Sequence, residues 1–170
     1  MNLTLLGFSG TGKTSVSRLL AGKLEKKLVS TDEECEKKAL MKVEKFVRKY
    51  GWIKFLELES EVIENISDFD DCVVDADSSI ILRNENIINL KKNGLIILLT
   101  ADQKTITSRI KKGLDGKDYT KANYIDKIRG AATEYEKKYR KAADYAIDTS
   151  NMSPGEVCDL IFHYMQMEMQ

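Results

Sequence analysis

Residues 3–20 read LTLLGFSGTGKTSVSRLL, and this stretch decides how the rest of the chain is interpreted. An apolar run of strand length, residues 3–8, leads into a glycine-rich loop that ends in Lys13-Thr14, and a helical pattern follows at once. Residues 7–14 match the pattern G-x-x-x-x-G-K-[ST] at every position. A strand, such a loop and a helix in this order form a binding site for the phosphates of a nucleotide.

The chemistry of this loop predicts both ATP and Mg²⁺ as cofactors. Its glycines let backbone N–H groups turn toward a phosphate, and the helix that follows points the positive end of its dipole at the same place. We expect Lys13 to reach the bridge between the β- and γ-phosphates and the Thr14 hydroxyl to ligate Mg²⁺. ATP is favoured over GTP because the chain has no N-K-x-D tetrapeptide, the usual guanine reader. The predicted nucleotide-binding residues of the loop are Gly7, Ser9, Gly10, Thr11, Gly12, Lys13, Thr14 and Ser15.

Four more apolar runs of strand length follow, and helical patterns separate them. Short apolar runs rich in β-branched residues, alternating with helices, are typical of buried parallel strands. We therefore predict one three-layer α/β domain over residues 1–170, with a five-stranded parallel sheet in the order 2-3-1-4-5. The four runs are residues 27–32, 71–77, 94–102 and 144–150.

The helical patterns are less regular than the strands. The first helix is expected to run to about Leu24, with Val16, Leu19, Leu20 and Leu24 on its buried face. A loop over residues 111–124, with two glycines, four lysines and no clear period, is predicted to be mobile. The other predicted helices are 33–66 (in two pieces broken near Tyr50-Gly51), 83–93, 103–112, 124–143 and a last one opened by Pro154 after a Ser153 cap.

The composition excludes several classes of protein. Lys plus Arg and Asp plus Glu each total 27, so the net charge is zero, which argues against a nucleic-acid binder or a membrane-surface binder. The three cysteines lie far apart and have neither disulfide-framework nor zinc-ligand spacing. The N-terminal apolar run is too short for a signal peptide, and no segment approaches the length of a membrane span. We expect a cytoplasmic protein.

A magnesium site needs a second anchor, and an aspartate at the end of a neighbouring strand is the usual one. The candidates are Asp32 after the second strand, and Asp75 and Asp77 after the third. Asp75 directly follows the apolar run 72–74, the pattern expected for a metal contact, so we assign it to Mg²⁺ beside Thr14. The alternative is that these aspartates only cap the helices that follow them.

At this point the layout resembles that of shikimate kinase, a small P-loop kinase with a five-stranded sheet, over nearly the whole chain. The similar segments are LLGFSGTGKTSVSRLLAGKL (5–24), LVSTDEECEKKA (28–39), VEKFVRKYGWIKFLELESEVI (43–63), LIILLTADQKTITSRI (95–110) and ADYAIDTSNMSPGEV (143–157). The resemblance implies a single P-loop kinase domain that phosphorylates a hydroxyl of a small molecule at the expense of ATP, under a closing lid. The loop 111–124 stands where that lid would be.

The resemblance also implies roles for individual residues. Arg109 would lie against the adenine, and Pro154 belongs to the loop on the adenine side. Asp32 would orient the acceptor hydroxyl or accept its proton. Lys13, Mg²⁺ and a lid lysine such as Lys117 would neutralise charge on the transferred phosphoryl group.

The chain departs from the family where the family binds shikimate. The family's Phe-Arg pair is Phe55-Leu56 here, its triple glycine is Asp77-Ser78-Ser79, and its arginine four residues before Tyr139 is Tyr135. Those arginines and that turn hold the shikimate carboxylate in the family, and each lost guanidinium removes a charged hydrogen bond worth about 1.5–3 kcal/mol. The candidate acceptor-binding residues of this chain are Asp32, Leu56, Glu59, Asp77, Ser78 and Tyr135.

Three hypotheses follow for the function. The first, which we favour, is a kinase of shikimate kinase type whose acceptor is a neutral or cationic hydroxylated molecule, because Asp32, Asp75 and Asp77 would make the pocket negative and no arginine would offset them. The second is a true shikimate kinase with an atypical acceptor site that uses other basic residues, such as Arg48, Lys54, Arg83 or Arg129. The third is a nucleotide-binding regulatory module that transfers no phosphoryl group.

Overall fold

The computed structural model describes residues 1–112 and 132–170, and its centre is a parallel sheet in the order β2-β3-β1-β4-β5. The predicted strand number, direction and order are confirmed. Each strand ends two residues before its predicted run does, because the chain leaves the hydrogen-bonded ladder to form the loops of the site. The strands are β1 (Asn2–Leu6), β2 (Lys27–Ser30), β3 (Cys72–Asp75), β4 (Gly94–Thr100) and β5 (Tyr145–Asp148).

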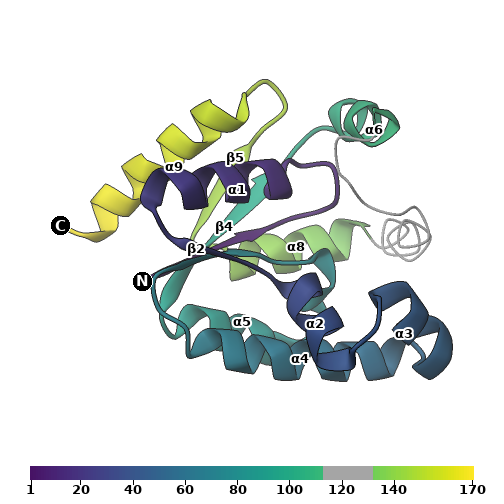
Figure 1. Ribbon diagram of the computed structural model, residues 1–170. Coiled ribbons are helices and arrows are strands. Elements are labelled where there is room, and N and C mark those ends of the chain that lie inside the picture. Colours follow the sequence, from purple (N-terminus) through teal and green to yellow (C-terminus); the bar gives the residue numbers. More distant parts are fainter. Residues whose placement is uncertain (113–131) are drawn as a thin grey trace.

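Helices cover both faces of the sheet and make the three predicted layers (Figure 1). One layer is α1 (Lys13–Leu24) with α9 (Pro154–Glu168), and the other is α4 (Trp52–Ser67) with α5 (Asn84–Lys91) and α8 (Ala132–Ala142). Three more helices complete the described chain: α2 (Thr31–Ala39), α3 (Val43–Tyr50) and α6 (Gln103–Lys111). A short 3₁₀ helix, η1 (Ser78–Leu82), joins β3 to α5.

The alternation of side chains along the strands divides the core into two clusters. Leu3 and Leu5 of β1 point into the cluster under α1 and α9, whereas Leu6 points into the one under α4, α5 and α8. Because β1, β3 and β4 are buried on both faces, their sequences are continuous apolar runs, and for this reason they could be recognised.

Three details of the predicted helices are wrong. Leu19 is 37% exposed, because α1 turns Val16, Ser17, Leu20 and Ala21 inward instead. The region 33–66 contains three helices, since the chain also breaks at Leu40, which has a φ of 56°. The 3₁₀ helix η1 was not predicted. Residues 113–131 of the predicted loop and of the predicted helix 124–143 lie outside the described residues.

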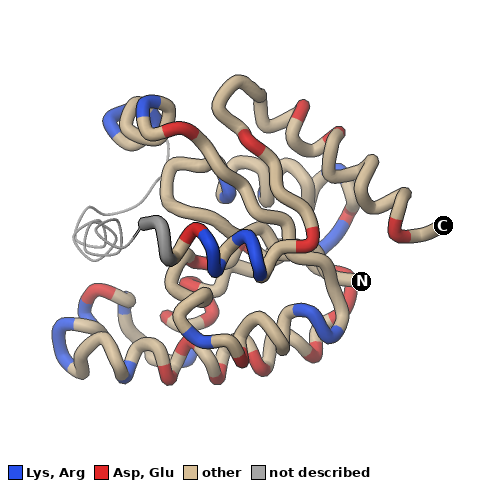
Figure 2. The backbone as a smooth tube through the Cα atoms, turned by 180° about the vertical axis from the view of Figure 1, so that it is seen from behind, with Lys and Arg blue, Asp and Glu red and all other residues tan. Residues whose placement is uncertain are grey.

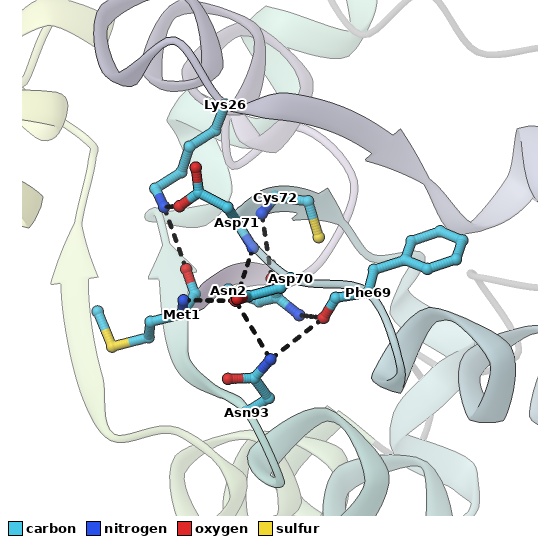
Figure 3. A network of polar contacts seen from close by, with 8 residues as sticks. All are labelled: Met1, Asn2, Lys26, Phe69, Asp70, Asp71, Cys72 and Asn93. Carbon is cyan, nitrogen blue, oxygen red and sulfur yellow. Dashed lines mark hydrogen bonds and ion pairs between the residues drawn. The ribbon is translucent and has the colours of Figure 1, made fainter.

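The amino-terminal ends of the strands are joined by a polar network around Asn2 (Figure 3). The Asn2 side chain is buried; its Nδ2 donates to the carbonyl of Phe69 at 2.8 Å, and its Oδ1 accepts from the backbone N–H of Cys72 at 3.1 Å. Its own backbone N–H donates to the carbonyl of Asn93 at 2.8 Å. One side chain thus fixes the entry into β3 beside β1, at the end of the sheet opposite the phosphate loop.

The surface charges are mixed in sign (Figure 2), as the equal numbers of basic and acidic residues predict, and the three cysteines form no disulfide with one another. Figure 2 shows Lys and Arg interspersed with Asp and Glu along the helices. Cys35, Cys72 and Cys158 are free and buried, and burial raises the pKa of the Cys72 and Cys158 thiols. Within residues 1–112 and 132–170, no helix combines the length and the apolar character that crossing a bilayer requires.

Candidate active site

The phosphate loop connects β1 to α1, and its backbone requires glycine at two places. Gly7 has a φ of 147°, and a Cβ at this residue would lie 2.3 Å from the carbonyl oxygen of Leu99. Gly10 has a φ of 82° and lies so close to Ile106 that a Cβ would come within 3.1 Å of its side chain. The loop is therefore held between the end of β4 and helix α6, with a shape that other residues could not adopt.

A cavity of about 300 Å³ opens above this loop. One part of its wall is the loop and the first turn of α1, which offer backbone N–H groups, hydroxyls and a lysine. The other part contains apolar side chains beside a guanidinium, as a flat heterocyclic base requires. The lining residues are Ser9, Gly10, Thr11, Gly12, Lys13, Thr14, Ser15, Val16, Arg109, Thr149, Met152, Pro154 and Val157.

The lysine of the loop is folded over its own backbone. The Lys13 Nζ donates to the carbonyl oxygen of Gly7 at 2.6 Å and to that of Phe8 at 3.2 Å, and the side chain is buried. The ammonium group is thus at the centre of the loop, where the phosphates of a nucleotide would lie.

Thr14 and Asp75, the two residues predicted to bind Mg²⁺, are in contact in the structure. The Thr14 hydroxyl donates to the Asp75 carboxylate at 2.9 Å, and this bond joins the start of α1 to the end of β3. Hydroxyl and carboxylate oxygens are the ligands that Mg²⁺ prefers, so this donor set fits the ion. The described residues contain no cluster of three or more His, Cys, Asp or Glu side chains that could hold a metal. Mg²⁺ in nucleotide sites is generally held by phosphates and water with one or two protein ligands.

On the base side of the cavity, Arg109 of α6 lies across the end of the loop. Its Nη1 donates to the carbonyl of Gly10 at 3.2 Å and to the hydroxyl of Thr149 at 3.0 Å, and its Nη2 donates to the carbonyl of Thr149 at 2.8 Å. Pro154 begins α9, where Ser153 and Glu156 form a capping box. The Ser153 cap and the start of α9 at Pro154 are confirmed.

The candidate acceptor residues gather around the segment that follows β3. The backbone N–H of Asp77 donates to the Thr31 hydroxyl at 2.9 Å, which places the first turn of α2, with Asp32, beside this segment. The Ser79 hydroxyl lies 2.6 Å from the Glu59 carboxylate and 3.0 Å from the Asp77 carboxylate. Glu59 is fully buried in α4 and Asp77 is 6% exposed. Two carboxyl groups and a hydroxyl are thus buried side by side.

A tyrosine of α8 supports this segment from the other side. The Tyr139 hydroxyl donates to the carbonyl of Ser78 at 2.7 Å, and its ring packs edge-on against Phe8 of the phosphate loop, with ring centroids 4.8 Å apart. Burial, reinforced by the nearby Asp77 carboxylate, raises the pKa of the Tyr139 phenol far above its ordinary value. The phenol therefore remains a hydrogen-bond donor and joins the acceptor segment to the nucleotide loop through α8.

Leu56 and Tyr135, which the resemblance places at the family's arginine positions, offer no cation. Leu56 is 7% exposed and belongs to the hydrophobic cluster under α4, α5 and α8. Tyr135 is half-buried and packs against the same cluster. Glu57, beside Leu56, points outward and pairs with Lys54 at 3.0 Å. Lys117 lies outside the described residues.

Sequence reasoning missed several contributors to the site. Thr149, Met152 and Ser79 were not assigned roles, although Thr149 and Met152 line the cavity and the Ser79 hydroxyl bridges two carboxylates. Thr149 directly follows β5, but this position does not say which of several polar residues turns toward the site.

Comparison with known proteins finds a matching family model and similar relatives. The family model described as shikimate kinase matches residues 9–166. The shikimate kinase of Pelotomaculum thermopropionicum is 32% identical over 165 residues, covering 97% of this chain and 95% of the relative. That of Thermodesulfovibrio yellowstonii is 35% identical over 160 residues, covering 94% and 92%. Among solved structures, shikimate kinase from Acinetobacter baumannii in complex with shikimate superposes with a TM-score of 0.86 at 23% identity, covering 98% of this chain and 93% of that one.

Proposed function

This chain belongs to the shikimate kinase family, and from that premise we propose that it transfers the γ-phosphoryl group of MgATP to a hydroxyl of a small metabolite other than shikimate. It is an ATP-dependent kinase of shikimate kinase type, and the family's cofactors are ATP and Mg²⁺. The proposal concerns the acceptor and the residues that act on it.

We assign the nucleotide half of the reaction to the phosphate loop. Backbone N–H groups and Lys13 bind the phosphates, Thr14 and Asp75 hold the metal, and Arg109 with Pro154 borders the base. When bound, Mg²⁺ would withdraw charge from the phosphoryl oxygens. The contact between the Thr14 hydroxyl and the Asp75 carboxylate supports this assignment, because two elements 61 residues apart bring these oxygens together at the cavity.

Asp32 is assigned to the acceptor hydroxyl. It lies in the first turn of α2, beside the segment that follows β3. From there its carboxylate would orient the hydroxyl and accept its proton as the phosphoryl group is transferred. The lid lysine Lys117 remains a prediction from the sequence.

The observation that carries the choice of acceptor is the position of Leu56. In the family an arginine here holds the shikimate carboxylate, whereas Leu56 is packed in the hydrophobic core and offers no donor. Tyr135 replaces a second arginine. Two lost charged hydrogen bonds, each worth about 1.5–3 kcal/mol, weaken the binding of a carboxylate by roughly 10²–10⁴-fold. The buried carboxyl groups of Glu59 and Asp77 favour a neutral or cationic acceptor further.

Shikimate itself is the second candidate acceptor. It is favoured by the names of the relatives, which are called shikimate kinases at 32–35% identity over nearly the whole chain. On this alternative, basic residues other than those of the family would hold the carboxylate.

A calorimetric titration separates the two candidates. Shikimate is titrated into protein loaded with MgADP, and we expect no saturable binding at millimolar concentration. In parallel, ATP consumption is measured against a panel of hydroxylated metabolites without a carboxylate, with shikimate included. Turnover of shikimate at ordinary kinase rates would overturn the proposed acceptor and leave the second candidate.

The Lys13→Ala variant is the control for the nucleotide half. It should abolish phosphoryl transfer with any acceptor and weaken ATP binding, because the ammonium at the centre of the loop is removed. Lys23→Ala, on the exposed side of the same helix, should leave both unchanged. Normal turnover by Lys13→Ala would contradict the assignment of the loop.

A further inference from the structure

We propose that Thr149 is a positioning residue for nucleotide recognition, whose hydroxyl holds the Arg109 guanidinium against the base of ATP. This inference rests on the proposed nucleotide site and adds to it a residue that does not itself touch the phosphates. Thr149 is the first residue after β5, and its side chain is 2% exposed.

The contacts of Thr149 fix the direction of its hydroxyl proton. Its Oγ1 lies 2.7 Å from the carbonyl of Thr11 and 3.1 Å from the carbonyl of Thr100. The Thr100 carbonyl already accepts from the backbone N–H of Thr149 at 2.8 Å. A hydroxyl has one proton to donate, so the shorter contact, with Thr11 in the phosphate loop, takes it.

With its proton committed to the loop, the hydroxyl presents a lone pair to Arg109. The Nη1 of Arg109 donates to this oxygen at 3.0 Å, while its Nη2 donates to the Thr149 carbonyl at 2.8 Å. One residue therefore receives both arms of the guanidinium, which fixes the plane of the fork as well as its position. The third contact, from Nη1 to the Gly10 carbonyl at 3.2 Å, keeps the group next to the loop.

This arrangement joins two parts of the nucleotide site that come from different elements. Arg109 lies on α6 beside Met152 and Pro154 at the base end of the cavity, and Thr11 lies in the phosphate loop. A guanidinium held in one plane can stack on a heterocyclic base, whereas a free one must lose rotamer entropy on binding. Loss of the Thr149 hydroxyl should therefore weaken the binding of ligands that have a base, and should change the binding of the phosphates alone very little.

The test compares a ligand with a base to one without. Binding of MgATP and of magnesium tripolyphosphate is measured by calorimetry for the wild-type protein and for Thr149→Val, which keeps the shape and loses the hydroxyl. We expect Thr149→Val to weaken MgATP about tenfold, and tripolyphosphate less than threefold. Thr149→Ser, which keeps the hydroxyl, should stay within threefold of wild type for both ligands.

A double-mutant cycle shows whether Thr149 acts through Arg109. Arg109→Met should weaken MgATP at least tenfold, and the double variant Thr149→Val/Arg109→Met should bind MgATP no more weakly than Arg109→Met alone. Thr100→Val is the matched control, since its hydroxyl donates to the carbonyl of Ile147, at 3.4 Å, and we expect both ligands to bind this variant as they bind wild type.

Several results would overturn the inference. These are an equal loss for both ligands in Thr149→Val, additive losses in the double variant, or wild-type MgATP affinity in Thr149→Val. Should Thr149→Val fail to fold, wild-type MgATP affinity in Arg109→Met overturns it equally. A wild-type protein that binds neither ligand would instead refute the proposed nucleotide site, and the inference with it.

Discussion

At the scale of single residues, Asp75 is the charged side chain whose proposed role can be tested most directly. Its carboxylate accepts from the Thr14 hydroxyl at 2.9 Å, so it orients a proposed metal ligand and would supply negative charge beside the proposed cation. The Asp75→Asn variant keeps an oxygen for Thr14 and loses the charge. We expect it to weaken ATP binding about 10–100-fold in the presence of Mg²⁺ and to change it little in the presence of EDTA.

The measurement is an ATP titration at a series of Mg²⁺ concentrations. The exposed Asp68→Asn, in the turn between α4 and β3, is the matched control and should behave as wild type. An unchanged Mg²⁺ dependence in Asp75→Asn would mean that the carboxylate only caps local structure, which was the alternative considered for it.

Individual site residues could be predicted from the sequence where a motif fixes their spacing along the chain. Lys13 and Thr14 followed from eight consecutive residues, and Asp75 from an apolar run that ends in a carboxylate. Thr149 could not be found in this way, because its contacts join positions far apart: Thr149 and Thr11 are separated by 138 residues. Only the packing of α6 and β5 against the loop selects Thr149 from its polar neighbours.

Among the elements, α6 is held at its amino-terminal end by two carboxyl groups that accept hydrogen bonds. The Asp102 carboxylate accepts from the backbone N–H of Thr105 at 2.7 Å, and the backbone N–H of Asp102 donates to the Ser150 hydroxyl at 2.8 Å. The Asp148 carboxylate in turn accepts from the N–H and the hydroxyl of Ser150. These hydrogen bonds lower the pKa of both carboxyl groups below the ordinary value.

The direction of these shifts gives a pH dependence. A carboxyl group with a lowered pKa in the folded protein stabilises it fully above its ordinary pKa of 3.8, and this stabilisation is lost as the pH falls through the lower, folded value. In thermal melts between about pH 5 and about pH 2, the double variant Asp102→Asn/Asp148→Asn should therefore lose less stability than wild type. Parallel pH curves for the two proteins would contradict this, and Asp68→Asn provides the single-charge control.

The elements differ in how much of them the sequence predicted. The central strands β1, β3 and β4 were found because burial on both faces leaves long apolar runs, and α9 because Ser153 and Pro154 mark its start. The break at Leu40 was missed because glycine or asparagine normally occupies that left-handed position, and Leu40 is neither. Leu19 was assigned to the wrong face of α1, since the small residues Ser17 and Ala21, which do face the sheet, gave no hydrophobic signal.

In the whole molecule, the candidate site lies at the carboxyl ends of the strands, and a structural hydrogen-bond network lies at their amino ends. The carboxyl ends of the strands carry the phosphate loop, Asp75 and the acceptor segment, as is general for open parallel sheets. The amino ends carry the Asn2 network (Figure 3). Stability and ligand binding should therefore respond to different substitutions.

The Asn2→Ala variant tests this separation. It leaves the buried backbone N–H of Cys72 without its acceptor and removes one of the two side-chain donors to the Phe69 carbonyl, the other being Asn93. An unsatisfied buried N–H costs about 1–3 kcal/mol, so we expect the free energy of unfolding to fall by about 2 kcal/mol and Tm by about 4–8 °C. Because the change is at the far end of β1, MgATP affinity measured below the melting range should be unchanged. Asn93→Ala, which removes an exposed partner from the same network, should lower Tm by much less. A loss of MgATP affinity in Asn2→Ala would show that the register of β1 at its amino end is transmitted along the strand to the phosphate loop, and that the two ends are not independent.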